Sequence, residues 1–284
     1  MIKKKLKSKI LVVYELSKNT GKGHYGRAVS IYNVLRKIYI NSRIISLEKL
    51  SKNMLEKYNY FILDFKNYNN KLLSDFKKIK KNVLTIENFQ NELSSINISI
   101  YDHNKKLNNI RYSGLKFATI DEKLKRKILK KNRNIFIFLG ASFNKKILLK
   151  KILNKFNNKN YKIYLSSLNS FYNFNFKNVK IVSQENWRNY FNRSHYCILN
   201  GGVTLLEALY LKKKCFVVPQ TKKELVFSNY LLKKKYIYSN KINQIDYFFH
   251  KRKKMKNVEV ANEIDKYGVN KIIKIFQSKI IKYD

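Results

Sequence analysis

The sequence predicts an α/β protein made of two doubly wound, Rossmann-like domains. Apolar runs of strand length alternate with amphipathic segments along all 284 residues, which is typical of parallel β-α-β units. A strand, a glycine turn and a helix occur in succession near the N-terminus, and the same succession starts again after residue 134. The length suits two domains of roughly 130–150 residues each better than one. We expect a first domain over residues 1–128 and a second over residues 129–284.

The first domain opens with the apolar run 9–14, which reads as a buried parallel strand. The glycine-rich turn 21–27 follows it, and the spacing of the apolar residues after the turn predicts a helix. Further strands are expected at 42–47, 60–64, 83–86, 96–101 and 117–119, with helices at 50–57 and 72–80.

The turn at residues 21–27 carries the first candidate site. Backbone N–H groups at the start of the following helix favour an anion, and Gly23 leaves them accessible. His24 lies on the same turn and has a side chain suited to proton transfer at neutral pH. The alternative is a turn that only connects two elements and leaves this histidine facing solvent.

Asp64 is the last residue of the third expected strand. Ligands of open α/β sheets collect at the carboxyl ends of the strands, so this carboxylate is a candidate site residue. It would equally serve as a helix cap or a loop residue.

A run of lysines and arginines over 121–134 predicts the boundary between the domains. After it come a strand at 135–139, the turn that begins at Gly140, and a helix over 147–156. The remaining elements are expected as strands at 161–165, 179–182, 195–199 and 215–218, and as helices at 187–191, around residue 229 and over 259–282.

The segment 200–208 indicates a second anion site. Gly201 and Gly202 open a helix, so N–H groups up to Leu205 would bind a diphosphate without obstruction by side chains. Glu207 follows one turn later and would accept hydrogen bonds from the two hydroxyls of a ribose. The alternative is a helix start with an acidic residue favoured by the helix dipole.

The net charge of +43 would suit a nucleic acid or an anionic membrane as partner. The lysines are spread through every segment together with many asparagines and isoleucines, which favours a general drift in residue usage and leaves at most weak membrane association. Cys197 and Cys215 lie in apolar runs and are expected as buried free thiols in a reducing compartment. The sequence has neither a signal peptide pattern nor a membrane-spanning segment, so a cytoplasmic location is expected. The histidine spacing predicts no metal site.

Three features in order along the chain resemble a known family. They are the Gly-His-x-x-Arg turn that ends at Arg27, the Gly-Gly-x-Thr-x-x-Glu segment 201–207, and the spacing from Pro219 to Asn229. Together they resemble the UDP-sugar hydrolases of the pseudaminic acid pathway, which are relatives of the GT-B glycosyltransferase of peptidoglycan synthesis.

The resemblance implies a GT-B-like fold whose two domains face a central cleft, and metal-independent release of UDP from a diacetamido trideoxy sugar with inversion. His24 matches the base that activates water, and Glu207 matches the carboxylate that holds the ribose. The other residues expected to bind substrate are Gly23, Arg27, Asp64, Gly140, Gly201, Gly202, Thr204, Leu205 and Asn229. No cofactor is expected, and the partner is the UDP-sugar and not a nucleic acid. The alternatives are a GT-B glycosyltransferase and an inactive sugar-nucleotide binder.

Overall fold

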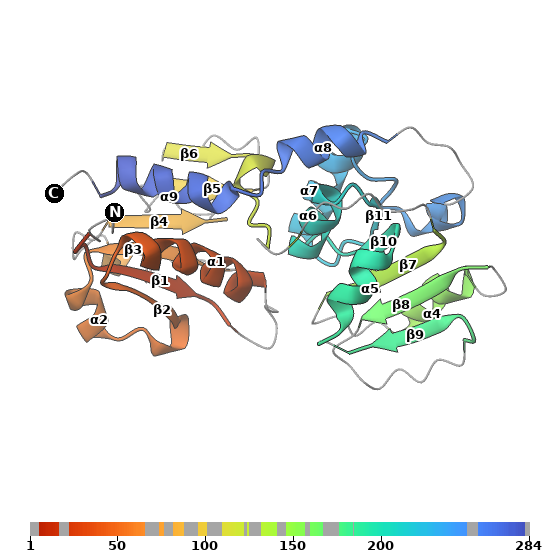
Figure 1. Cartoon of the computed structure of the whole chain (residues 1–284), viewed down its shortest axis with the longest axis horizontal. Helices are drawn as coiled ribbons and strands as arrows, with labels where there is room; N and C mark the ends of the chain where they lie inside the picture. Colours follow the sequence, from red (N-terminus) through yellow and green to blue (C-terminus); the bar gives the residue numbers. More distant parts are fainter. Residues whose placement is uncertain are drawn as a thin grey trace. The chain divides into compact units, whose positions relative to one another are not determined.

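The computed structural model describes most of the chain. The described residues are 6–16, 23–65, 74–76, 82–87, 96–100, 110–121, 124, 132–140, 146–156, 160–166, 176–183, 185–248 and 255–281. The chain divides into two compact units (Figure 1). One unit combines Met1–Asp121 with Asp265–Asp284, and the other is Glu122–Ile264.

The first unit is built on a six-stranded sheet in which every described pairing is parallel. Its order is β2-β1-β3-β4-β5-β6, so the chain builds one edge first and then continues on the other side of β1. The strands are β1 (Ile10–Tyr14), β2 (Ser42–Ser46), β3 (Tyr60–Asp64), β4 (Asn82–Ile86), β5 (Ile96–Ser99) and β6 (Ile110–Ser113).

Helices cover this sheet because its strands are apolar on both faces. Side chains alternate along a strand, so Leu11 and Leu63 point to the face where residues of the short helix α2 (Lys52–Lys57) complete a cluster. The helix α1 (Gly23–Ile38) packs on β1 and β2. The C-terminal helix α9 (Gly268–Lys279) packs on α1, and its Phe276 contacts Tyr60 edge to face.

The C-terminal segment differs from the expected domain division. The sequence predicts residues 265–284 as part of the second domain, but α9 packs in the first unit, against α1 and the 3-10 helix η2 (Leu115–Phe117). Gly268 permits this approach, because a Cβ at this position would overlap the carbonyl oxygen of Ala118. The other boundary falls at Asp121, in the basic run that we expected to separate the domains.

The second unit has a five-stranded sheet, again with every described pairing parallel, in the order β11-β10-β7-β8-β9. Its strands are β7 (Asn134–Phe138), β8 (Lys162–Ser166), β9 (Val179–Val182), β10 (Tyr196–Leu199) and β11 (Lys214–Val217). Its helices are α4 (Lys146–Asn154), α5 (Trp187–Arg193), α6 (Val203–Tyr210), α7 (Lys222–Lys233), η3 (Ile242–Phe248) and α8 (Asn257–Glu263).

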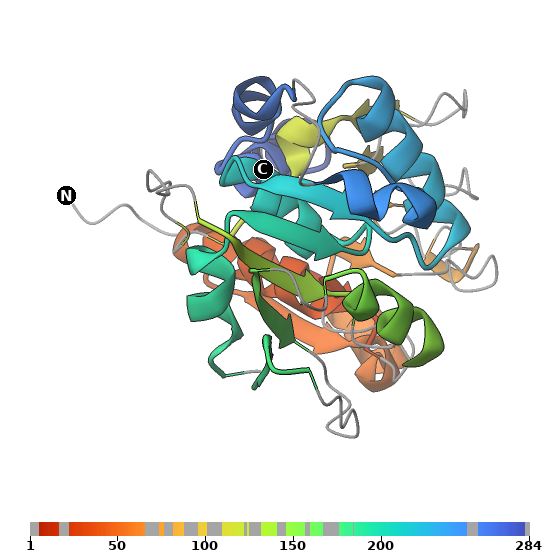
Figure 2. The same cartoon turned by 90° about the vertical axis from the view of Figure 1, so that its right-hand side faces the viewer.

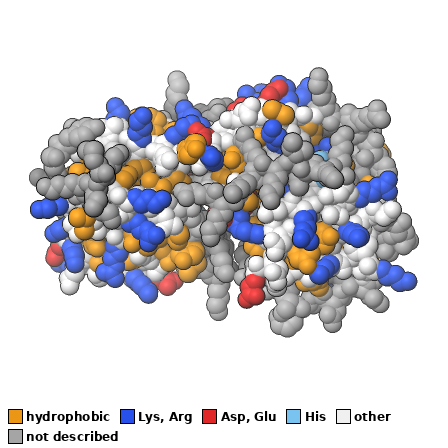
Figure 3. All heavy atoms as spheres, in the orientation of Figure 1, with side chains coloured by type: hydrophobic (Ala, Val, Ile, Leu, Met, Phe, Trp, Pro, Cys, Tyr) orange, Lys and Arg blue, Asp and Glu red, His pale blue; other side chains and the backbone are white. Residues whose placement is uncertain are grey.

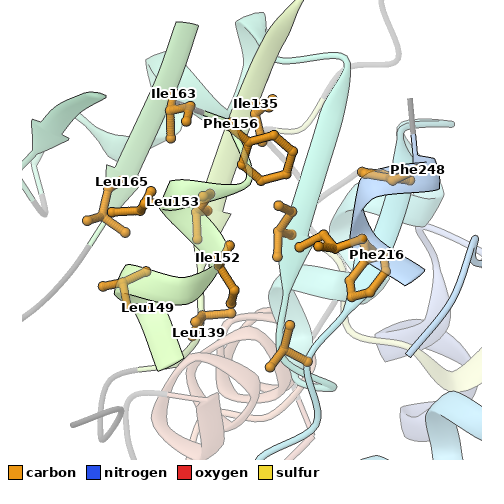
Figure 4. Packing of buried hydrophobic residues seen from close by; sticks show 14 of the residues in the cluster. Ile135, Leu139, Leu149, Ile152, Leu153, Phe156, Ile163, Leu165, Phe216 and Phe248 are labelled. Carbon is orange, nitrogen blue, oxygen red and sulfur yellow. The ribbon is translucent and has the colours of Figure 1, made fainter. Parts of the chain in front are cut away.

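The two faces of β7 are covered by different helices. Ile135 belongs to a cluster with Leu149 and Leu153 of α4 and with Phe248 of η3 (Figure 4). The next residue, Phe136, points to the other face and contacts the rings of α5. Figure 2 shows α4 and α5 on opposite sides of the strands. The second unit is therefore a three-layer α/β sandwich, as the sequence predicts.

Three local expectations need correction or comment. The sixth strand is β6 and not 117–119, because the chain turns at Gly114 with φ of 116° and continues as η2. The strand expected at 42–47 ends at Ser46, where the 3-10 helix η1 (Leu47–Lys49) begins. The helix expected over 72–80 lies mostly outside the described residues, which there include only the helical residues 74–76.

Cys197 and Cys215 are buried and free, as predicted, and they lie opposite one another on β10 and β11. Lys and Arg side chains are scattered over the face drawn in Figure 3, on both units, and do not gather in one patch there. Within the described part of the chain, no helix has both the length and the apolar character needed to cross a membrane.

Candidate functional site

The first candidate site lies where the strand order of the first sheet reverses. β1 has β2 on one side and β3 on the other, and crevices for ligands form at the carboxyl ends of two such strands. The chain that leaves β1 enters α1, whose second residue is His24. Asp64 is the last residue of β3 and pairs in register with Tyr14 at the end of β1. The reversal therefore brings together two residues that are 40 positions apart.

His24, Arg27 and Asp64 form one hydrogen-bonded cluster. The Nδ1 atom of His24 lies 2.7 Å from Oδ1 of Asp64. Arg27 binds the same carboxylate through both oxygens, with Nε donating to Oδ2 at 2.6 Å and Nη2 donating to Oδ1 at 2.5 Å. His24 and Arg27 share one face of α1 because they are three residues apart on a helix. Asp64 has no exposed surface, so it holds both side chains from inside the protein.

Burial alone would raise the pKa of Asp64, but the charge of Arg27, then that of His24, and their hydrogen bonds outweigh it and lower the pKa to about 2. Asp64 is therefore ionised near neutral pH, and its carboxylate accepts a hydrogen bond from Nδ1–H of His24. When the ring is neutral, this hydrogen bond leaves the lone pair on Nε2. The His24 side chain is 17% exposed, so its ring reaches the surface although its anchor does not.

The sequence predicts that Arg27 and Asp64 bind substrate; in the structure both are buried and bind each other. We interpret them as residues that orient His24. Gly23 is the first residue of α1 and is exposed, as an anion site at this helix start requires. The cluster can act as a general base, since a carboxylate that holds Nδ1–H leaves Nε2 to take a proton.

The second sheet reverses its strand order between β7 and β10, and the glycines of the sequence motifs meet there. Gly140 follows β7 and has φ of 97°, a conformation that favours glycine. Gly202 precedes α6 as its N-cap residue. The side chain of Asn200 lies between these glycines, with Nδ2 at 3.2 Å and 3.3 Å from the positions that a Cβ on Gly140 and on Gly202 would take.

The start of α6 fits an anion site, except that Leu205 would not contribute to it. The N–H of Leu205 donates to the carbonyl oxygen of Gly202 at 3.1 Å, and the Leu205 side chain is buried. The N–H groups of Val203 and Thr204 precede it in the first turn, where helix geometry supplies no intrahelical carbonyl. The anion site would therefore use the backbone before Leu205 and not this residue itself.

Glu207 and Asn229 both interact within the second unit. Glu207 is 4% exposed, and its Oε1 lies 3.6 Å from Nη2 of Arg188 on α5. Asn229 lies in the interior of α7, where its Oδ1 accepts a hydrogen bond from Nδ2 of Asn240 at 2.7 Å. Both side chains therefore have partners within the second unit.

Glu224 was missed by sequence reasoning, although Thr221 and Glu224 have the spacing of a capping box at the start of α7. Thr221 is the N-cap residue, and its hydroxyl oxygen accepts from the Glu224 N–H at 3.2 Å. The Glu224 carboxylate accepts from Asn200 Nδ2 at 2.8 Å and from the Gln220 N–H at 2.6 Å. It thus joins the loops that follow β10 and β11. Among the described residues no three His, Cys, Asp or Glu side chains are placed to hold a metal ion.

The comparisons with known proteins agree on the fold. No protein family model matches the chain, and no curated protein matches it. Solved structures match over nearly the whole length. MurG from Acinetobacter baumannii has 11% identity and a TM-score of 0.62, covering 96% of this chain and all of MurG. MnaA from S. aureus, solved with UDP, has 9% identity and a TM-score of 0.68, covering 98% of this chain and 99% of MnaA.

A third match is a protein from Listeria monocytogenes described as a putative UDP-N-acetylglucosamine 2-epimerase. It has 9% identity and a TM-score of 0.66, and the match covers 98% of each chain. At such low identity these structures establish the fold alone. The chain has the GT-B-like fold that the sequence predicts: two α/β units, each with a parallel sheet and helices.

Proposed function

We propose that this chain hydrolyses a UDP-activated deoxyamino sugar to free sugar and UDP, in pseudaminic acid or other surface glycan biosynthesis. The proposal has a broad part, action on a nucleotide-activated sugar, and a narrow part, water as the acceptor. The broad part is supported by the near full-length structural matches, which include MurG and a complex of MnaA with UDP. The narrow part rests on the resemblance of the sequence motifs to the hydrolases.

The observation that carries the proposal is the His24 and Asp64 pair. In the proposed reaction Nε2 of His24 takes a proton from water while the water oxygen bonds to the anomeric carbon. The bond from that carbon to the diphosphate oxygen breaks, and UDP leaves with the bonding electrons. Because water attacks the face opposite the leaving group, the anomeric centre is inverted. Asp64 stabilises the imidazolium that forms, because its carboxylate already binds Nδ1–H at 2.7 Å.

The leaving diphosphate is the part of the substrate that we assign to the second unit. Gly202 and the first N–H groups of α6 would bind it, because a helix start favours an anion. Gly201, also expected from the sequence to bind the diphosphate, lies buried beside the Glu224 side chain. Preorganised donors of this kind stabilise charge that develops in the transition state. Gly140 and Asn200 lie beside these groups and complete the proposed diphosphate site.

A glycosyltransferase is the second candidate. The structural matches include glycosyltransferases such as the spinosyn rhamnosyltransferase SpnG, with a TM-score of 0.66. In that reaction an acceptor hydroxyl would replace water, and the same base would take its proton. The presence or absence of an acceptor in the assay therefore separates the two functions.

The test is to incubate the purified protein with the UDP-linked diacetamido trideoxy sugar, without any acceptor, and to follow free UDP and free sugar by NMR. We compare the wild type with His24→Asn and Ser30→Ala. The asparagine amide retains a donor for Asp64 but has no equivalent of Nε2. Ser30 is a control on the same helix, where its hydroxyl donates to the carbonyl oxygen of Gly26.

We expect acceptor-free release of UDP in the wild type and in Ser30→Ala, and a rate lower by about 10²–10⁴-fold in His24→Asn. UDP binding measured by calorimetry should persist in all three. Wild-type turnover by His24→Asn would contradict the assigned base. Release of UDP only in the presence of an acceptor would identify the transferase, and UDP binding without turnover under either condition would identify an inactive binder.

A further inference from the structure

We propose that Glu224 is a positioning residue that orients the Asn200 side-chain amide between Gly140 and Gly202. Its function would be to present a neutral amide, and not a carboxylate, to the nucleotide diphosphate. The inference rests on the proposed function, because it concerns the diphosphate site of that same substrate. Neither Asn200 nor Glu224 is among the site residues expected from the sequence.

Both oxygens of Glu224 already have partners. Oε1 accepts from Asn200 Nδ2 at 2.8 Å, and Oε2 accepts from the Gln220 N–H at 2.6 Å. The side chain passes over Gly201, where a Cβ would lie 2.7 Å from Cβ of Glu224. The missing side chain of Gly201 therefore makes room for Glu224 at the loop that carries Asn200.

The carboxylate decides which end of the amide faces it. An ionised carboxylate only accepts hydrogen bonds, so the NH₂ group of Asn200 must point to Glu224. The Asn200 carbonyl oxygen must then point away from this carboxylate. Nδ2 lies 3.2 Å and 3.3 Å from the positions of the missing Cβ atoms of Gly140 and Gly202, while Oδ1 lies 3.5 Å from that of Gly202 alone, so Nδ2 is the polar atom nearest to both glycines.

The same arrangement separates the negative charge of Glu224 from a bound anion. The Glu224 carboxylate receives two N–H donors and lies at the first turn of α7, where the helix dipole also favours it. Asn200, which carries no charge, is the side chain next to the glycines. A carboxylate in its place would repel a diphosphate directly.

The alternative is that the pair only braces the loops after β10 and β11. The double variant N200D/E224Q separates the two roles, because it reverses the pair. The new amide at position 224 can donate to the new carboxylate at position 200 and still accept from the Gln220 N–H. Both hydrogen bonds are retained, but the negative charge moves to the side of Gly140 and Gly202. The single variant E224Q keeps both bonds only if the Asn200 amide turns over.

We would measure UDP affinity by calorimetry at low and high salt, and unfolding of the second unit by the fluorescence of Trp187, the only tryptophan in the chain. For N200D/E224Q we expect near wild-type stability and a UDP affinity lower by about tenfold or more at low salt, because like charges would be juxtaposed. High salt should recover part of the loss, since it screens repulsion between charges. E224Q should weaken binding less, with no salt-sensitive component.

If the pair only braces the loops and Asn200 does not face the bound diphosphate, every variant with both hydrogen bonds should bind UDP like the wild type, at any salt concentration. Wild-type affinity in N200D/E224Q would therefore overturn this inference alone. Failure of the wild type to bind UDP would overturn the proposed function together with it. If the double variant does not fold, E224Q remains as the test, and unchanged UDP affinity in a folded E224Q would also overturn the inference.

Discussion

The two sheets of this protein have candidate sites at the same topological position, but the two sites consist of different types of residue. At the reversal point of the first sheet, ionisable side chains meet: His24 and Arg27 bind the buried carboxylate of Asp64. At the reversal point of the second sheet, Gly140 and Gly202 flank the neutral amide of Asn200. The site of the first sheet consists of ionisable side chains, and the site of the second sheet consists of residues with small or neutral side chains beside the backbone.

The difference follows from what each site would do. A general base needs a ring that is held in one tautomer and one orientation, which a buried ion pair supplies. An anion site needs N–H groups that a ligand can approach closely, which glycine permits. The same strand topology therefore serves both, and the residue types at the strand ends decide the chemistry.

The largest expected effect breaks the charged site. Asp64→Asn leaves Arg27 buried without its carboxylate, which should destabilise the first unit by about 3–5 kcal/mol. Asp246→Asn is the matched control, because its ion pair with Lys155 is exposed and should contribute about 0–1 kcal/mol. Urea unfolding followed by circular dichroism measures both. If both variants lower the free energy of unfolding equally, the buried Asp64 cluster stabilises the fold no more than an exposed ion pair does.

The next effect breaks the glycine site. Gly201→Ala would place a methyl group 2.7 Å from Cβ and 3.1 Å from Cα of Glu224, so α7 or the loop must move. We expect a loss of about 1–3 kcal/mol, detected by Trp187 fluorescence. Gly26→Ala is the control in α1, where nothing lies within 4 Å of the new Cβ, and it should stabilise by about 0.5–1 kcal/mol. A neutral Gly201→Ala would indicate that the space beside Glu224 is not limiting.

A third prediction sharpens the comparison by pH. Because the pKa of Asp64 is about 2 in the folded chain against 3.8 ordinarily, its ionisation stabilises the fold above pH 4. This contribution, about 2 kcal/mol, is lost as pH falls from 4 to 2, since the unfolded chain binds the proton first. The difference in unfolding free energy between the wild type and Asp64→Asn should therefore shrink over this range. A difference that stays constant with pH would contradict the lowered pKa.

The smallest effect concerns the helix starts. Thr221 caps α7 by accepting the Glu224 N–H, so Thr221→Ala should cost about 1 kcal/mol. Ser51 is the N-cap residue of α2 but makes no side-chain capping hydrogen bond, so Ser51→Ala should change stability less. Urea midpoints of the two variants measure the difference. A larger loss of stability in Ser51→Ala than in Thr221→Ala would contradict the conclusion that Thr221, and not Ser51, caps its helix.

Much of the fold and part of the candidate site could be predicted from local patterns. Apolar runs and glycine turns located nearly every described strand, and they placed His24 after β1 and Asp64 at the end of β3. The same patterns could not reveal that Arg27 binds Asp64 and not a ligand. That contact joins residues 37 positions apart and exists only because α1 packs on β1, the strand next to β3 in the sheet.

Composition, apolar periodicity and the glycines thus determined the α/β class, the positions of the strands and the helix starts where anions would bind, because these depend on backbone conformation over a few residues. Strand order, the return of α9 to the first unit, and the Asn200 and Glu224 pair were decided only by the tertiary structure. Each of these joins surfaces far apart in the chain. Their free energy comes from burial and hydrogen bonds that form after the elements have packed, and no local pattern in the sequence reports it.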